Sequence, residues 1–394
     1  NFTYLFLGFV VLVFFIKTIF IVFLTHKQNR FLTNITAYIS NNLLTSYLSQ
    51  PYKFHLKRNA SDLIKNIQVE IYYLYVFLLS LITLFIEGGF IISVLATLIF
   101  IEPFGAISIG TFYGLLSFIF LKFTKRKLNK WGNLRQELDG ELSKIALEGL
   151  GGIKDLLILG KTSFYIEQFS RKNYLRARLN ANQGTVSQIP RFYLELVSIL
   201  GLVSFIITLM IKGMDTANLI TVLGVFVAGT FRMIPSLNRI IAAKQSMKYY
   251  FPSINIIYNE IKLYDQIKTI QNSNDNFKFQ NEIELHNVGF SYSKDNFILK
   301  NINLKITEGQ NIGIIGESGS GKSTLVDLLI GLHKPTSGEI FIDGKKDFQL
   351  KESWRSKIGY VSQSIYLTDD TIKNNIALGI PEDRIDISRI NKLI

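Results

Sequence analysis

The sequence predicts an all-α transmembrane domain over residues 1–264 and a smaller α/β domain over residues 282–394. Five apolar segments come first, each long enough to cross a bilayer, which takes about 20 residues. After residue 281 the apolar residues fall into short alternating runs, a pattern typical of strands, with one helical run among them. The polar segment 265–281 between the two patterns has no periodicity and is expected to be a linker.

The connections between the apolar segments indicate their orientation. Two connections are very short, whereas segments 25–69 and 122–191 are long and basic, with six lysines and arginines against one acid and fourteen against six. Because positive charge is retained on the cytoplasmic side, both long connections are expected in the cytoplasm. Residue 1 would then lie outside, and everything after about residue 240 inside. The expected spans are roughly 2–24, 71–101, 104–121, 192–212 and 216–238.

The long connections are expected to continue the membrane helices, because their apolar residues recur at a spacing of three to four. Each helix would project into the cytoplasm and turn back. The first turn is expected near residues 50–59, where Pro51 breaks the helix. The second is expected near residues 157–169, at Gly160.

Composition narrows the classes of partner and chemistry. The chain has no cysteine, which excludes disulfides and thiolate metal sites. Its formal net charge is +13, but residues 1–281 hold 29 lysines and arginines against 15 acids, and the rest hold 14 against 15. The positive charge therefore flanks the apolar spans, which favours a membrane and argues against nucleic acid as a partner.

The segment "GESGSGKST" predicts a phosphate-binding loop. Gly316-x-x-x-x-Gly321-Lys322-Ser323 matches the P-loop pattern and stands between an expected strand, "IGIIG", and an expected helix, "STLVDLLIGL". Glycines let backbone N–H groups turn inward around phosphate oxygens, and the helix directs its positive end there. We expect Lys322 to contact the β- and γ-phosphates and Ser323 to ligate Mg²⁺. The expected phosphate contacts are Gly316, Glu317, Ser318, Gly319, Ser320, Gly321, Lys322, Ser323 and Thr324.

Other short runs predict strands around this loop. "IELHNVGFSYS", "GEIFIDG" and "KIGYVSQ" are each expected to form one strand. "NINLKITEGQNIGIIG" is expected to form a pair of strands that leads into the loop.

Three features around the loop resemble the nucleotide-binding domain of ATP-binding-cassette (ABC) transporters: Tyr292 in "VGFSYS", Gln363 in "IGYVSQSIYL", and "KPTSGEIFIDG" between them. The resemblance implies that Tyr292 stacks on the adenine of ATP. It also implies that Gln363 senses Mg²⁺ and the γ-phosphate, and that Lys322 and Gln363 assist the catalysis of ATP hydrolysis. In that family the signature loop and the catalytic glutamate follow the glutamine, and neither occurs here. We therefore expect this chain alone not to turn over ATP, and the intact protein to do so.

The membrane half resembles that of ABC exporters, whose long intracellular loops end in short transverse helices; the candidates here are residues 51–58 and 159–169. That family has six membrane helices per half, which implies a missing first helix, a homodimer, and a bacterial inner-membrane location with the nucleotide domain in the cytoplasm. "YLSQPYKFHLKRNASDLIKNI", "EGLGGIKDLLILGK" and "FRMIPSLNRI" resemble the bacterial flippases of lipid-linked oligosaccharides for protein N-glycosylation and related glycolipid and polysaccharide exporters.

Arginines in or beside the last two spans are candidate substrate contacts. Arg232 falls within a span, Arg239 follows seven residues later on the same helical face, and Arg191 lies where the fourth span begins. A charge in hydrocarbon usually faces a watery cavity, and guanidinium binds phosphate bidentately, which fits a pyrophosphate-linked oligosaccharide lipid. Arg191 and Arg239 could instead snorkel to the interface, and Glu87 could pack helices or face a cavity.

Other functions stay open at this point. A drug, peptide or general lipid exporter would show the same spans and the same phosphate loop. A non-transporting regulatory ABC protein would use the nucleotide site only as a switch.

Overall fold

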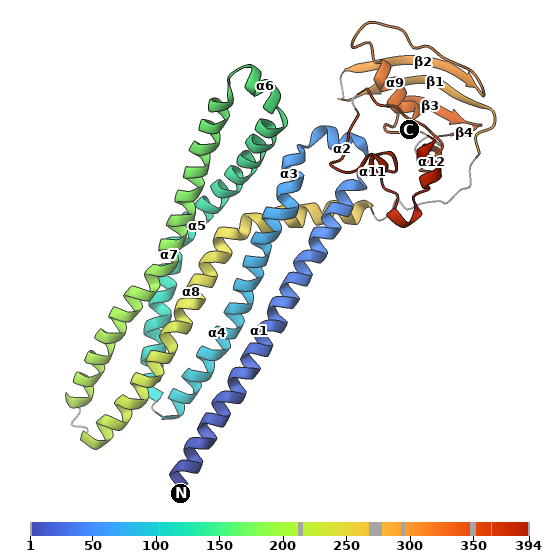
Figure 1. Cartoon of the computed structure of the whole chain (residues 1–394). Helices are drawn as coiled ribbons and strands as arrows, with labels where there is room; N and C mark the ends of the chain where they lie inside the picture. The colour runs from blue at the N-terminus through green and yellow to red at the C-terminus, as the bar shows by residue number, and fades with distance from the viewer. Residues whose placement is uncertain are drawn as a thin grey trace. The chain divides into compact units, whose positions relative to one another are not determined.

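The computed structural model describes residues 2–101, 103–211, 216–267, 278–292, 296–346, 352–363 and 365–392. The chain divides into two compact units, Asn1–Gln271 and Asn272–Ile394, and the division falls within the segment expected to be a linker. The first unit is helical, and the second contains a sheet (Figure 1).

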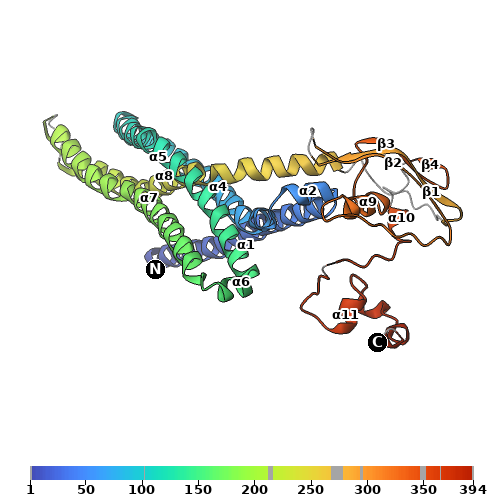
Figure 2. The same cartoon turned by 90° about the horizontal axis from the view of Figure 1, so that it is seen from above.

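Five long helices build the first unit: α1 (Phe2–Leu48), α4 (Ile71–Ile101), α5 (Pro103–Gly151), α7 (Thr162–Ile211) and α8 (Thr216–Ile267). Each of these helices except α4 is continuous over an expected membrane span and the expected cytoplasmic extension next to it. Between α1 and α4 lie α2 (Tyr52–Lys57), α3 (Ala60–Lys65) and a π-helical turn, Asn66–Glu70. The short helix α6 (Ile153–Ile158) joins α5 to α7 (Figure 2).

The two expected turns occur where a residue interrupts the helical backbone. Pro51 directly precedes α2, and its ring cannot continue α1, which ends at Leu48. Gly160 has φ +63°, a left-handed conformation that separates α6 from α7 at little cost for glycine.

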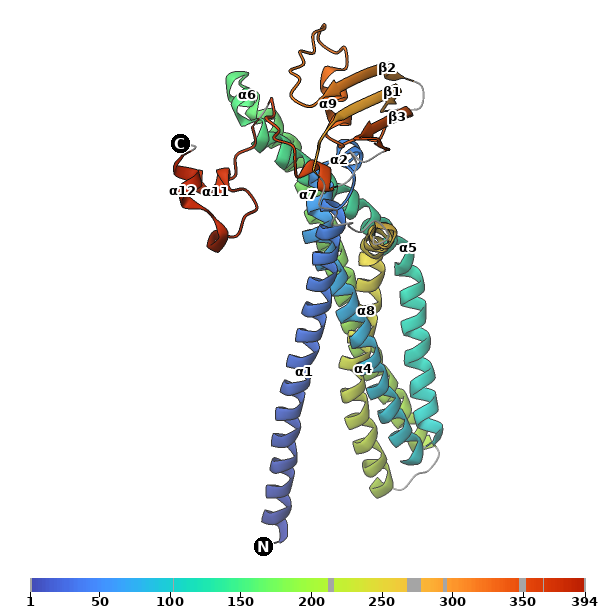
Figure 3. The ribbon, with the colours of Figure 1, turned by 90° about the vertical axis from the view of Figure 1, so that its right-hand side faces the viewer.

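Among the described residues, two helical runs are long and apolar enough to cross a membrane: Phe2–Leu48 and Ala60–Phe100. No residue in the most apolar window of Phe2–Leu48 is buried, and Figure 3 shows α1 diverging from α4 and α8 towards its N-terminus. The expected spans 104–121, 192–212 and 216–238 lie in α5, α7 and α8, partly on residues outside the described set, and stay predictions.

Helix α8 is the central element of the first unit, since it packs against α4, α5 and α7. The backbones of α8 and α5 approach closely where Tyr249 of α8 meets Gly132 of α5. A Cβ added to Gly132 would lie 2.3 Å from the carbonyl oxygen of Tyr249. Glycine is therefore required at residue 132 for the two backbones to meet. Further along, Ile257 of α8 packs with Leu43 and Tyr47 of α1.

The described residues of the second unit form an antiparallel sheet with strand order β2-β1-β3-β4. Its elements are β1 (Glu282–Ser291), β2 (Phe297–Thr307), α9 (Lys322–Leu329), β3 (Ser337–Ile342), β4 (Lys345–Lys346), α10 (Glu352–Arg355), α11 (Ile372–Ile376), the 3₁₀ turn Glu382–Arg384 and α12 (Ile387–Asn391). Leu328 of α9 is fully buried with Leu285 and Phe290 of β1, so α9 covers one face of the sheet.

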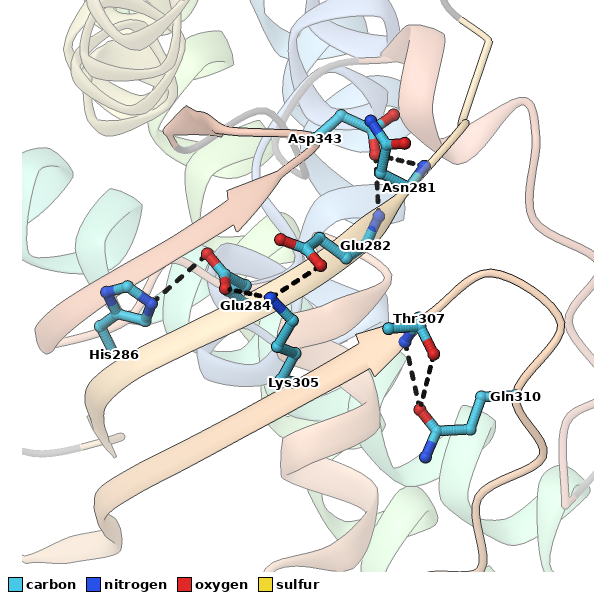
Figure 4. A network of polar contacts seen from close by, with 8 residues as sticks. All are labelled: Asn281, Glu282, Glu284, His286, Lys305, Thr307, Gln310 and Asp343. Atoms are coloured by element: carbon cyan, nitrogen blue, oxygen red, sulfur yellow. Dashed lines mark hydrogen bonds and ion pairs between the residues drawn. The ribbon is translucent and has the colours of Figure 1, made fainter.

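Polar side chains fix the start of the sheet (Figure 4). Lys305 of β2 lies 2.8 Å from Glu282 and 3.0 Å from Glu284 on the neighbouring strand β1. The Asp343 carboxylate accepts three backbone N–H bonds of 2.8–2.9 Å from residues 280–282. This carboxylate ties the entry of β1 to the turn that follows β3.

Two expected strands are wrong. The structure describes segments 311–316 and 357–363 without strand structure, whereas the strands expected at β1, β2 and β3 are confirmed. A strand needs a neighbour for its ladder hydrogen bonds, and among the described residues no strand pairs with either segment. Ile315 is 97% exposed, so its apolar side chain does not mark a buried strand within the described fold.

Candidate nucleotide-binding site

The phosphate loop is shaped by glycines between β2 and α9. Gly319 has φ +84° and Gly321 has φ +93°, which glycine adopts without the clash that a Cβ would cause. A Cβ on Gly321 would lie 2.9 Å from the Leu299 side chain and 3.0 Å from that of Ile298, both in β2. The loop therefore lies directly against β2, and only glycine fits at residue 321.

The Lys322 side chain folds back over this loop. Its Nζ donates to the carbonyl oxygens of Gly316, at 2.8 Å, and Glu317, at 2.7 Å. The Ser320 N–H donates to the Glu317 carbonyl at 3.2 Å, which closes the turn. The ammonium is therefore held at the loop by acceptors within the same chain, beside the first turn of α9.

The first turn of α9 is suited to an anion. Its leading N–H groups have no acceptor within the helix, and the helix dipole adds positive potential there. Lys322 and an exposed Ser323 stand on this turn, whereas Thr324 is buried. Backbone donors, an ammonium and a hydroxyl together fit a phosphate group with a bound divalent cation.

Tyr292 follows the end of β1 and is half-buried. Its ring makes edge contacts with Phe290, at 4.9 Å between centroids, and with His333, at 5.4 Å. Tyr292 also packs on the same core as Leu325 and Leu329 of α9. The structure thus joins the expected adenine-stacking residue and the phosphate-loop helix through one cluster of side chains.

Gln363 is exposed in an irregular segment. In the part of the chain that the structure describes, no hydrogen bond joins it to Lys322 or Ser323. Its expected role at Mg²⁺ stays a prediction.

The candidate substrate arginines lie in the first unit, and two of them are paired. Arg239 of α8 lies 2.5 Å from Glu87 of α4, whose side chain is only 9% exposed. Arg191 lies 3.1 Å from Glu195, one turn along α7, and both side chains are exposed. Arg232 lies in α8, and its side chain is outside the described part of the structure.

A buried charged cluster, which no pattern in the sequence predicts, lies where α4, α5, α7 and α8 meet. Arg135 of α5 is fully buried, with its guanidinium carbon 3.8 Å from the ring centroid of Tyr73, and it donates to Ser253 at 3.0 Å. Asp139 is also buried and pairs with Arg176 of α7 at 2.6 Å. Burial raises the pKa of the Asp139 carboxyl, and the two guanidinium groups oppose that shift. The 3–4 spacing marks α5 as helical but gives no sign of which charges face inward.

Known proteins resemble both units. Residues 299–392 match the ABC transporter family. An ATP-dependent lipid A-core flippase of Wigglesworthia glossinidia brevipalpis is 30% identical over 349 residues, covering 86% of this chain and 58% of that protein. The ATP-dependent lipid A-core flippase of Escherichia coli is 27% identical, covering 76% of this chain and 51% of that protein.

Other relatives carry different names. A putative multidrug export ATP-binding/permease protein of Staphylococcus aureus is 42% identical over 118 residues, covering 28% of this chain and 20% of that protein. Against the full-length flippases, the chain spans about half to three-fifths of their length.

A solved structure extends the likeness to the fold of most of the chain. The structure of a bacterial Atm1-family ABC exporter with ATP bound matches with a TM-score of 0.70 at 20% identity, covering 92% of this chain and 64% of that one. The chain thus has the fold of an ABC exporter half-transporter, with an ABC transporter nucleotide-binding region in its second unit.

Proposed function

We propose that this protein is an ATP-driven exporter that moves a lipid-linked substrate across a membrane. The observation that carries the proposal is the phosphate loop, with Lys322 folded over it, in a chain of exporter fold. Tyr292 then stacks on adenine, residues 316–324, with Lys322 among them, hold the phosphates, and Ser323 and Gln363 ligate Mg²⁺. Lys322 and Gln363 assist the hydrolysis of ATP.

The proposed setting is a bacterial inner membrane, with the second unit in the cytoplasm and a second copy of the protein as partner. The basic extensions support this orientation, because positive segments are retained on the cytoplasmic side. A homodimer fits a chain with one membrane half and one nucleotide-binding region.

The proposed cargo is a pyrophosphate-linked oligosaccharide lipid, contacted by arginines of the last two spans. Two relatives named as lipid A-core flippases support a lipid cargo. Arg239 and Arg191 are paired with glutamates, so a phosphate would compete with Glu87 and Glu195 for them. Arg232 falls deepest within an expected span, where snorkelling is hardest, so it is the arginine that we test first.

The second candidate function is drug export. It is favoured by the relative named as a putative multidrug export protein, although the match covers only 28% of this chain. A regulatory ABC protein that binds ATP without transport is the third.

The test is glycolipid flipping and ATPase activity, measured in the same vesicles reconstituted with the full-length protein. Arg232→Ala should reduce flipping while basal ATPase activity survives, since Arg232 and the nucleotide site lie in different units. Arg232→Lys should restore flipping only in part, because an ammonium keeps the charge but loses the bidentate fork. Arg171→Ala, an exposed arginine of α7, is the matched control and should leave both activities unchanged.

Unchanged flipping in the Arg232→Ala protein would remove this arginine from the cargo site. ATPase activity without any glycolipid flipping in the wild-type protein would favour the drug-export alternative. Stimulation of that ATPase activity by a drug would then support it.

A further inference from the structure

The turn after α9 directs one aromatic residue back into the core. Gly331 adopts φ +79°, its N–H donates to the Leu328 carbonyl at 3.2 Å, and the Leu332 N–H donates to the Asp327 carbonyl at 2.9 Å. These two bonds form a Schellman motif, which ends the helix and reverses the chain. The next residue, His333, is consequently only 3% exposed.

His333 contacts both aromatic residues near the end of β1. Its ring centroid lies 4.9 Å from that of Phe290 with the planes tilted by 30°, and 5.4 Å from that of Tyr292 at 85°. Phe290 and Tyr292 also meet edge to face at 4.9 Å. The three rings thus support one another, and Tyr292 is the half-buried one among them.

A single short helix connects this aromatic group to the phosphate loop. Helix α9 has eight residues, so it is about 12 Å long. It begins at Lys322, in the loop, and His333 directly follows the turn that ends it. Asp327 on α9 interacts with His333 as well: burial raises the pKa of the Asp327 carboxyl, and His333 opposes that shift. Any displacement of His333 therefore changes its contact with the Tyr292 ring. This contact lies near one end of α9, and the expected phosphate loop lies at the other end.

We propose that His333 is a positioning residue that holds the Tyr292 ring at the orientation and distance from the phosphate loop that adenine stacking requires. The proposal rests on the proposed role of Tyr292 as the residue that stacks on adenine. His333 acts through Tyr292 and does not touch the nucleotide. His333 therefore contributes to the affinity for the adenine base and does not affect the affinity for the phosphates.

The experiment measures the affinity of the full-length protein for ATP and for inorganic tripolyphosphate, which has no base. His333→Ala should weaken ATP binding about threefold to tenfold, the range of an edge-to-face aromatic pair, and leave tripolyphosphate binding unchanged. His333→Phe keeps a ring of similar size and should stay within about twofold of wild type for both ligands. Thermal unfolding confirms that each variant is folded.

A double-mutant cycle isolates the contact between the two rings. Tyr292→Ala alone should weaken ATP binding, since base–aromatic stacking is worth about 1–3 kcal/mol, or roughly fivefold to 150-fold. Adding His333→Ala to Tyr292→Ala should cause no further loss of ATP affinity, because nothing is left to position.

The possible failures are distinguishable. Normal ATP affinity in Tyr292→Ala would overturn the stacking role in the proposed function, and the positioning role with it. Three results would overturn the positioning role alone: unchanged ATP affinity in His333→Ala, an equal loss for tripolyphosphate, or losses that add in the double variant. Loss of ATP affinity in a folded His333→Phe protein would also overturn it, because a ring alone would then be insufficient.

Discussion

Replacing Gly321 with alanine should damage the nucleotide site through two separate terms. The first is conformational, because φ +93° is a left-handed backbone that costs a residue with a Cβ about 1–2 kcal/mol. The second is steric, because the new methyl would lie 2.9 Å from Leu299 and 3.0 Å from Ile298. Extra methyl groups in a packed region cost about 1–3 kcal/mol.

Together the two terms give about 2–5 kcal/mol of strain, which the loop can relieve by moving away from β2. Movement of the loop misplaces the N–H groups at the start of α9. ATP affinity should therefore fall by between about thirtyfold and a few thousandfold. The assay is equilibrium binding of ATP to the full-length protein, with thermal unfolding followed on the same samples.

Two other glycines with positive φ separate the conformational cost of an added Cβ from its steric cost. Gly319 has φ +84° and no atom within 4 Å of an added Cβ, so Gly319→Ala carries only the conformational term and should lower ATP affinity about tenfold. Gly344, in the turn after β3, has φ +72° and equally open space, so Gly344→Ala should cost about 1–2 kcal/mol of stability without changing ATP affinity. Equal losses of affinity for Gly321→Ala and Gly319→Ala would refute the steric argument.

Three further perturbations test the nucleotide site, the orientation and the buried cluster. Lys322→Ala should abolish ATP hydrolysis by the full-length protein and leave its melting temperature unchanged, since the Lys322 ammonium bonds to carbonyl oxygens of the loop; wild-type turnover would contradict the P-loop assignment. A cysteine at Asn218 should react with an impermeant thiol reagent from outside the cell, and one at Asn133 only after the membrane is opened; the reverse pattern would overturn the orientation drawn from charge. Arg135→Ala should lower the free energy of unfolding by about 3–5 kcal/mol, because removing one partner leaves the rest of a buried charge cluster unbalanced. Denaturant unfolding measures the loss, and the exposed Arg126→Ala on the same helix should show none.

The sequence by itself determined the features that depend on neighbouring residues. The glycine spacing from Gly316 to Gly321 predicts the phosphate loop, because the turn is a property of the local backbone. Uninterrupted helical periodicity predicts the long helices, and Pro51 and Gly160 predict their turns.

Only the tertiary structure decided which distant groups meet. Glu87 and Arg239 are 152 residues apart, and their ion pair depends on how α4 crosses α8. The burial of Arg135 and the contact of His333 with Tyr292 arise in the same way, from elements that approach after the chain has turned. The segment 311–316 shows the reverse case: its sequence favours a strand, but a strand forms only where a partner supplies the ladder hydrogen bonds. Periodicity reports which face of an element is apolar, whereas partner choice depends on crossing angles and register that no local pattern encodes.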